Sequence, residues 1–231
     1  MTDTTRPIRR FRKLRIFGIT LIVVLLVGGF FLQRFMYAHQ DPESLPDLLK
    51  VGSAAPAFTA VDTRGTSHSL AGYAGKWVVL EWFNHGCPAT KKHYDLVNGT
   101  GNTQAMQQEY TKRGVIWLSV VSSGPGRQGY LSSPKKANNV AADKGAVPTA
   151  IIRDTAGVLG RLYGARNTPQ YAIVDSTGVL RYIGAIDDRP TWSSTAIEGA
   201  TNYVRAALDS GLAGRPIAVA QTQPYGCEVK Y

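Results

Sequence analysis

The sequence has little cysteine: Cys87 and Cys227 are the only two in 231 residues. It also lacks motifs that would assign a function directly. The serines and histidines form no nucleophile-elbow motif of the hydrolase type, and no glycine loop for binding phosphate occurs. The chain has no internal repeat and no low-complexity segment. Any thiol chemistry therefore rests on two residues.

Acidic residues are scarce as well, with 16 Asp and Glu against 26 Lys and Arg and a net charge of +10. The excess of base is uneven, because residues 1–15 carry six Lys and Arg and a single acid, Asp3. Since half of the net charge lies in one short tail, the high pI does not indicate nucleic-acid binding. No nucleic-acid partner is expected.

Charge is absent from the 17 residues that follow, Ile16 to Leu32. At about 1.5 Å per residue this run spans about 25 Å, which crosses a bilayer when Arg15 and Arg34 snorkel. The sequence therefore predicts a single-pass transmembrane helix over residues 16–34.

The distribution of basic residues predicts the orientation of that helix. Residues 1–15 are the more basic flank and are expected in the cytoplasm, with everything beyond the cell membrane in the periplasm or its equivalent. The alternative is a cleaved signal peptide, for which Met36-Tyr37-Ala38 is a poor small-x-small site.

The centre of the chain is a nearly unbroken run of strand formers, Trp77 to Phe83, followed by the turn residues 84–86. Such a run is typical of a strand buried on both faces of an α/β sheet. Cys87 and Pro88 then begin a predicted helix, with the cysteine near the N-cap. There, unpaired backbone N–H groups and the helix dipole favour a thiolate, so the pKa of Cys87 is expected below the ordinary thiol value.

Elements alternate around this centre. Turn residues, apolar periodicity and capping signals predict a series of strands and helices. The predicted strands are 57–61, 67–70, 115–121, 148–152, 170–175 and 179–183. The predicted helices are 103–113, 134–144, about 156–163, and a last one from the capping box Thr195-x-x-Glu198 to Gly211.

The strand, turn and Cys-Pro helix resemble the thioredoxin fold, and more narrowly the redoxins of the peroxiredoxin-like (alkyl hydroperoxide reductase / thiol-specific antioxidant) superfamily. The ending Pro-Tyr-Gly-Cys-Glu-Val-Lys-Tyr also resembles that of one redoxin subgroup. The resemblance implies an α/β, thioredoxin-like three-layer sandwich over residues 51–212. The tether 35–50 would join it to the membrane helix, and residues 213–231 would form a C-terminal tail.

Two positions depart from the family patterns. Thioredoxins have Cys-x-x-Cys, and here the fourth position is Thr90. Peroxiredoxins have Pro-x-x-x-Thr-x-x-Cys, and here the Pro and Thr positions hold Leu80 and Asn84. Disulfide exchange needs only an accessible thiolate and a docking loop, so it is favoured over peroxide reduction.

Other residues take expected roles from their context. Glu81 lies where thioredoxins place a buried acid for proton transfer to the active-site thiols; the alternative is a sheet edge open to solvent. The hydroxyl of Thr90 lies one turn after Cys87, where it can donate to the thiolate or simply be a first-turn residue. The resemblance places Thr168 and Pro169 in the cis-proline loop that binds an incoming peptide; the alternative is a trans proline at a strand start.

Cys227 lies far along the chain from Cys87. The 19 residues from Asp209 to Cys227 extend up to about 60 Å, so contact between the two cysteines is allowed. Outside the cytoplasm the pair is compatible with a disulfide. A resolving thiol ranks first, ahead of a structural bridge and an intermolecular bond.

The sequence as a whole predicts a membrane-anchored, extracytoplasmic thiol-disulfide oxidoreductase with Cys87 as nucleophile. Its partners would be a thiol or disulfide protein, or a peroxide, and an external thiol reductant. The alternatives are a thiol peroxidase and a non-catalytic copper carrier or interaction module on the same fold. His85 and His93 flank Cys87, but their spacing matches no ligand pattern, so no metal and no cofactor are expected.

Overall fold

The computed structural model of the chain describes residues 49–96 and 101–231. The strands are β1 (Thr59–Val61), β2 (Ser67–Ser69), β3 (Val78–Trp82), β4 (Ile116–Val121), β5 (Ala150–Arg153), β6 (Asn167–Thr168), β7 (Gln170–Val174), β8 (Leu180–Gly184) and β9 (Cys227–Glu228). The α-helices are α2 (Pro88–His93), α3 (Asn102–Lys112), α4 (Pro134–Asp143), α5 (Val158–Leu162) and α6 (Tyr203–Leu212), with short 3-10 helices η1 (Ala71–Tyr73) and η2 (Ser194–Ile197).

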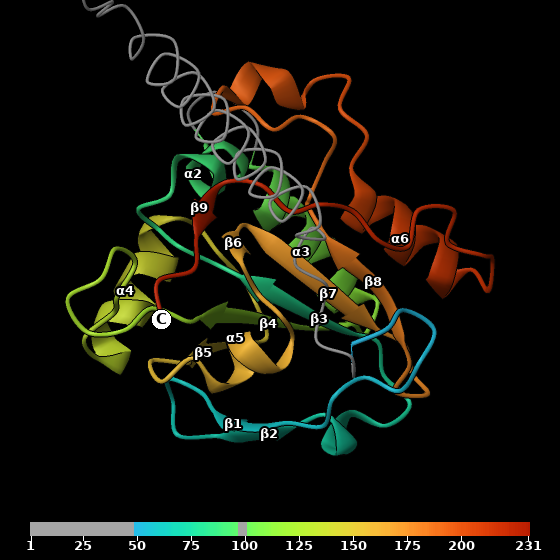
Figure 1. The fold of residues 1–231 in the computed structure, drawn as a ribbon, viewed down its shortest axis with the longest axis horizontal. Helices are drawn as coiled ribbons and strands as arrows, with labels where there is room; N and C mark the ends of the chain where they lie inside the picture. Colours follow the sequence, from blue (N-terminus) through green and yellow to red (C-terminus); the bar gives the residue numbers. More distant parts are fainter. Residues whose placement is uncertain (1–48, 97–100) are drawn as a thin grey trace, which may run out of the picture. The chain divides into compact units, whose positions relative to one another are not determined.

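A five-stranded sheet in the order β5-β4-β3-β7-β8 forms the centre of the domain (Figure 1). Strands β3, β4 and β5 run parallel, while β7 pairs antiparallel with β3 and makes a hairpin with β8. All five residues of β3 are buried, as the apolar run predicts. The strand therefore delivers its carboxyl end, and the turn after it, from the middle of the core.

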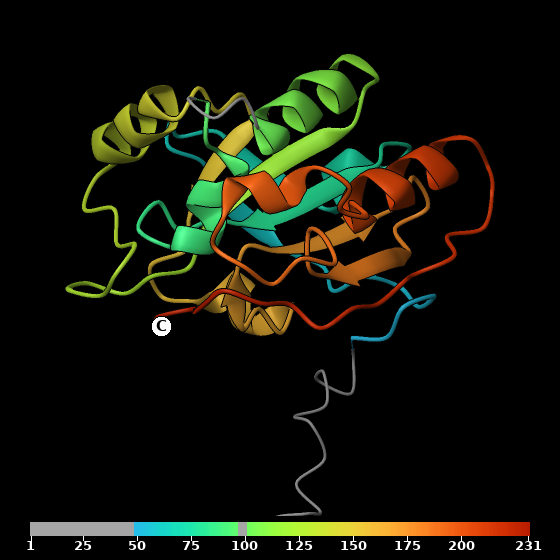
Figure 2. The ribbon, with the colours of Figure 1, turned by 90° about the horizontal axis from the view of Figure 1, so that it is seen from above.

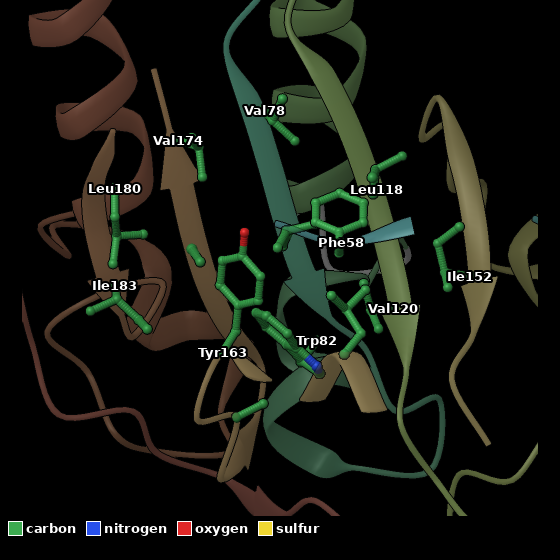
Figure 3. Packing of buried hydrophobic residues seen from close by; sticks show 14 of the residues in the cluster. Phe58, Val78, Trp82, Leu118, Val120, Ile152, Tyr163, Val174, Leu180 and Ile183 are labelled. Carbon is green, nitrogen blue, oxygen red and sulfur yellow. The ribbon is translucent and has the colours of Figure 1, made fainter. Parts of the chain in front are cut away.

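Alternate residues of the sheet pack into two different layers. On one face Leu80 and Trp82 pack with Tyr163, next to α5, and with Phe58 from the N-terminal hairpin (Figure 3). On the other face Val79 packs against residues of α3 and α6. The sheet thus lies between two layers, which confirms the predicted α/β sandwich (Figure 2).

The predicted strands and helices inside the domain agree with the structure to within one or two residues at each end, with one exception. The last helix does not begin at the capping box 195–198. It begins at Tyr203, where the Asn202 side chain caps it by accepting from the backbone N–H of Arg205 at 2.9 Å. Thr195 instead lies in η2, and Gly199, with φ of +73°, separates that short helix from α6.

The C-terminal segment after α6 runs along one side of the domain and ends near α5 (Figure 2). It makes backbone bonds to the hairpin at Ile183, whose N–H donates to Ala220 and whose carbonyl accepts from Thr222. Further on, β9 pairs antiparallel with β6. The tail is therefore laid onto the folded sheet rather than built into it.

The predicted basic tail 1–15, the membrane helix 16–34 and nearly all of the tether 35–50 lie outside the described residues. Within 49–96 and 101–231, no helix combines the length and the apolar character that crossing a bilayer requires.

Candidate active site

Cys87 is the N-cap residue of α2, and Pro88 occupies the first turn of the helix, as predicted. The turn after β3 is closed by Asn84, whose carbonyl accepts from the N–H of Cys87 at 3.0 Å and whose side chain accepts from Gly86 at 2.9 Å. The side chain of Cys87 is 0 % exposed. Strand and turn therefore fix the sulfur rigidly at the positive end of the helix.

The loop before β7 faces this sulfur. The peptide bond between Thr168 and Pro169 is cis, which confirms the predicted cis-proline loop. The Cys87 thiol donates to the backbone carbonyl of Thr168 at 3.0 Å. Two segments 81 residues apart in sequence thus meet at one sulfur atom.

The tail brings the second cysteine to the same place. Cys227 pairs with Thr168 across the ladder of β6 and β9, and its backbone N–H donates to the Cys87 sulfur at 3.3 Å. The Thr168 hydroxyl donates to the Cys227 carbonyl at 3.3 Å. Both cysteines are free thiols in the structure. The length of the tail allows contact between Cys87 and Cys227, and the structure shows that contact.

The two thiols are electrostatically unequal. Burial opposes ionisation of Cys87, but hydrogen bonds from the Cys227 thiol and from the backbone N–H groups of Thr90 and Cys227 outweigh it, so the pKa of Cys87 is lowered. Burial and the neighbouring Cys87 sulfur raise the pKa of Cys227 to about 12. The thiolate therefore forms on Cys87, while Cys227 keeps its proton.

Of the two roles that the sequence leaves open for Thr90, the structure shows the first-turn residue. Its side chain is buried, and its hydroxyl makes no hydrogen bond within the described residues. The backbone N–H of Thr90 is the group that stabilises the Cys87 thiolate. The first turn of the helix thus supplies the donor, and the hydroxyl does not.

Glu81 is buried as predicted, at 0 % exposure in the middle of β3. Its two carboxyl oxygens lie within hydrogen-bond distance of five neutral side chains. These are the Tyr94 hydroxyl at 2.6 Å, the Trp117 indole at 2.7 Å, the Ser119 hydroxyl at 2.9 Å, the Gln107 amide at 3.0 Å and the Tyr171 hydroxyl at 3.3 Å. Burial raises the pKa of Glu81, although the hydrogen bonds from Tyr94, Trp117, Ser119 and Gln107 oppose the rise. None of the five donors comes from Cys87 or Cys227, so the acid has no direct contact with the thiols.

A buried polar cluster beside the site was not predicted from the sequence. Lys92 and His93 on α2 lie with Asp187, which follows β8, around the hydroxyl of Tyr225 in the tail. The one signal in the sequence is the position of Tyr225, two residues before Cys227. His93 is a buried hydrogen-bonding residue, and no group of three metal-binding side chains occurs within the described part of the chain.

Comparison with known proteins gives a consistent family. Residues 51–183 match the AhpC/TSA family. The chain is 26% identical over 187 residues to the thiol:disulfide interchange protein DsbE of Vibrio cholerae, covering 78% of this chain and 91% of the relative. It is 25% identical over 163 residues to the thiol-disulfide oxidoreductase ResA of Geobacillus kaustophilus, covering 71% and 82%.

Solved structures share the fold. A conserved protein from Geobacillus kaustophilus superimposes with a TM-score of 0.65 at 23% identity, covering 80% of this chain and 94% of that one. A hypothetical protein from Sinorhizobium meliloti gives 0.63 at 20% identity, covering 79% and 95%. At these identities the likeness concerns the fold alone.

Proposed function

The chain belongs to the AhpC/TSA family of thioredoxin-fold redoxins, and we propose that it is a thiol-disulfide oxidoreductase with Cys87 as nucleophile and Cys227 as resolving thiol. One observation carries this proposal: the Cys87 sulfur lies at a helix N-terminus and makes hydrogen bonds with both Thr168 and Cys227. The N-terminus of α2 and the backbone N–H of Thr90, which do not depend on the tail, favour the thiolate and make Cys87 the better nucleophile of the pair. The two relatives named as disulfide oxidoreductases point to the same chemistry.

The first step is attack of the Cys87 thiolate on a substrate disulfide. One sulfur of the substrate bonds to Cys87, and the other leaves as a thiolate with the electron pair of the broken bond. Because the negative charge on Cys87 is thereby lost, two of the causes that raise the pKa of Cys227 disappear. The tail thiol becomes easier to deprotonate once it is needed.

In the second step the Cys227 thiolate attacks the Cys87 sulfur. The substrate leaves as its second thiolate, and a Cys87–Cys227 disulfide remains in the protein. Two electrons have passed from the protein's thiols to the substrate, and an external thiol reductant restores the starting state. The reverse sequence oxidises a substrate dithiol by the same bonds.

Peroxide reduction is the weaker candidate. It needs donors that stabilise charge on the departing oxygen, and the family's Pro and Thr positions hold Leu80 and Asn84. Leu80 is buried in the apolar core and has no donor, and the side-chain oxygen of Asn84 accepts from the Gly86 N–H within the turn. Disulfide exchange requires neither.

The cellular location is part of the proposal. The basic residues 1–15 and the apolar run 16–32 support a membrane anchor with the redoxin domain outside the cytoplasm. A reporter fused after Tyr231 should function only outside the cytoplasm, and the full chain should resist carbonate extraction. If sequencing of the mature protein places its N-terminus near His39, the apolar run is a cleaved signal peptide and not a membrane anchor.

Stopped-flow mixing tests the reaction. The reduced protein is mixed separately with a model disulfide and with hydrogen peroxide, and oxidation of Cys87 is followed by mass spectrometry of quenched samples. We expect the disulfide to oxidise Cys87 faster. Peroxide consumption far above the rate of a free thiol would make the protein a peroxidase instead.

A further inference from the structure

We propose that the C-terminal tail lies in the protein's own substrate groove, and that the groove prefers extended segments with tyrosine two residues before, and glycine immediately before, the reacting cysteine. The inference rests on the proposed function, because it assigns the substrate class of the same site. The tail is treated as a bound example of that class.

The backbone of the tail binds as an added strand. Cys227 pairs with Thr168 and Glu228 with Asn167, antiparallel to the two-residue edge strand β6. The Asn167 amide donates to the Gly226 carbonyl at 3.1 Å, and the N–H of Val229 donates to the carbonyl of residue 166 at 2.7 Å. Main-chain bonds to a sheet edge accept any extended peptide, so they supply affinity without choosing its sequence.

Substrate and tail exclude one another at this edge. Cys87 is 0 % exposed while the Cys227 N–H lies on its sulfur, so a disulfide from outside reaches the thiolate only after β9 leaves β6. A substrate that then uses the free edge of Thr168 presents its own cysteine where Cys227 was. The side-chain pockets that flank Cys227 become pockets for the substrate.

The position before the cysteine accepts only glycine. Gly226 has φ of +103°, and a Cβ added there would lie 2.1 Å from the Thr168 carbonyl oxygen and 2.9 Å from the Ala89 Cβ. Both the backbone conformation and the lack of space exclude other residues in this geometry.

Buried polar and charged side chains contact the residue two positions before the cysteine. The Tyr225 hydroxyl donates to Asp187, and it accepts from Lys92 at 3.1 Å. The side chains of Lys92 and His93 are 0 % exposed, and that of Asp187 is 2 % exposed. The Lys92 ammonium also lies 5.2 Å from the centre of the tyrosine ring.

His93 supplies a second hydrogen-bond donor to the Tyr225 hydroxyl. The Asn202 amide donates to the Asn102 oxygen, which turns the Asn102 nitrogen towards Nδ1 of His93 at 3.0 Å. Burial and the nearby Lys92 lower the pKa of His93 to about 3, so the ring is neutral and carries one proton. Because Nδ1 accepts from the Asn102 amide, that proton lies on Nε2, which is 3.1 Å from the Tyr225 hydroxyl. The pocket therefore offers two donors and one acceptor to a single oxygen on an aromatic ring.

When the tail is undocked, the pocket can bind a tyrosine side chain of the substrate in place of Tyr225. When the tail leaves, Lys92 and Asp187 keep their ion pair at 3.2 Å but both lose their hydrogen bond to the tyrosine hydroxyl, and bonds to buried charged groups contribute more than neutral ones. A phenylalanine at this position fills the pocket but makes no hydrogen bond there, and an alanine neither fills the pocket nor makes the hydrogen bonds. We expect the pocket to distinguish Tyr from Phe by about tenfold in rate, as for other hydrogen bonds to buried charged groups.

The test uses the reduced full chain with Cys227→Ser, so that the first attack is seen alone. Octapeptides with the sequence of residues 222–229 carry a nitrothiobenzoate group on their cysteine. Attack by Cys87 on the peptide sulfur releases that group as a coloured thiolate. Matched peptides replace the tyrosine by Phe or Ala, or the glycine by Ala, and the symmetric disulfide of the same nitrothiobenzoate is the reference. The tail of the protein competes equally with every peptide, so the ratios of their rates are unaffected.

The parent peptide should react about tenfold faster than the Phe peptide, and the Ala peptides should be slower than the parent. Asp187→Asn on the same background should bring the Tyr and Phe peptides close together. Equal rates for all four peptides, with the reference disulfide still reacting, would overturn the inference and leave the proposed function standing. Failure of Cys87 to react with the reference disulfide would overturn the proposed function itself.

Discussion

The two cysteines come from regions that are held in place by different forces. Cys87 begins the helix that follows, after one turn, a strand whose five residues are all buried and which pairs with a neighbouring strand on each side. Cys227 lies on a two-residue strand in a tail, placed by edge hydrogen bonds and by the polar contacts of Tyr225. The core thus fixes one thiol permanently, whereas the second thiol is held by contacts that can be broken and remade.

The largest expected effect separates the two cysteines by chemistry. Cys87→Ser should abolish reaction of the reduced protein with a model disulfide, because the lowered pKa and the position at the helix N-terminus belong to Cys87, and the remaining thiol lies on the tail without them. Thiol titration before and after one equivalent of oxidant measures this. Disulfide reduction by the Cys87→Ser protein at the original rate would make the tail cysteine the nucleophile.

The second effect shows what the tail adds. Cys227→Ser should leave the first attack intact but prolong the mixed disulfide at Cys87 by at least about a hundredfold, because no thiol at position 90 can take over locally. Non-reducing gels and mass spectrometry of trapped partners follow this species. Cys227→Ala is the matched variant, since it removes the hydroxyl as well. Rapid release in both variants would show that an external thiol, not the tail, resolves the intermediate.

The sequence predicts these two regions unequally, for physical reasons. The strand, the turn and the Cys-Pro helix are local patterns, so the site of Cys87 could be placed from the residues alone. The cis proline at 169 followed from the family resemblance and is confirmed. Docking of Cys227 depends on contacts between residues more than a hundred positions apart, such as Lys92 with Tyr225, and these leave no local period.

Two further residues show the same limit of local patterns. The capping box at Thr195 predicts the start of the last helix, whereas Asn202, seven residues further along the chain, caps it. For Thr90 the sequence leaves two roles open, and the structure shows the first-turn residue, whose backbone N–H and not its hydroxyl stabilises the thiolate. In both cases the residue type fitted the role, and only the three-dimensional arrangement decided which donor or acceptor was used.

The third effect concerns the core region alone. Burial raises the pKa of Glu81, so the folded protein keeps a proton there at pH values where the unfolded chain has lost it. The free energy of unfolding should therefore fall as pH rises above the unfolded value, by up to about 1.4 kcal/mol per pH unit, until the folded pKa is passed. Glu81→Gln should flatten this slope and gain stability relative to the parent with rising pH.

Chemical denaturation at a series of pH values measures the Glu81 effect. The substituted amide can lie at the oxygen that faces Tyr94 and Tyr171, whose hydroxyls can rotate to accept from it. Tail docking should be unaffected, because Glu81 makes no hydrogen bond to the tail in the described structure. A parallel pH slope in both proteins would mean that Glu81 is ionised in the fold.

The smallest effect sharpens the account of the tail. Tyr225→Phe keeps the ring but removes the hydroxyl that accepts from Lys92 and donates to Asp187. The tail should then dock less often, and the second phase of the reaction, formation of the Cys87–Cys227 disulfide, should slow by roughly three- to tenfold. The first phase should not slow, because it requires an undocked tail. Tyr231→Phe is the matched control: its hydroxyl donates to the Ala165 carbonyl at 2.6 Å, outside the polar cluster, and its loss should slow the second phase less. Equal slowing by the two variants would show that the tail is held by its whole length, with no special role for the pocket around Tyr225.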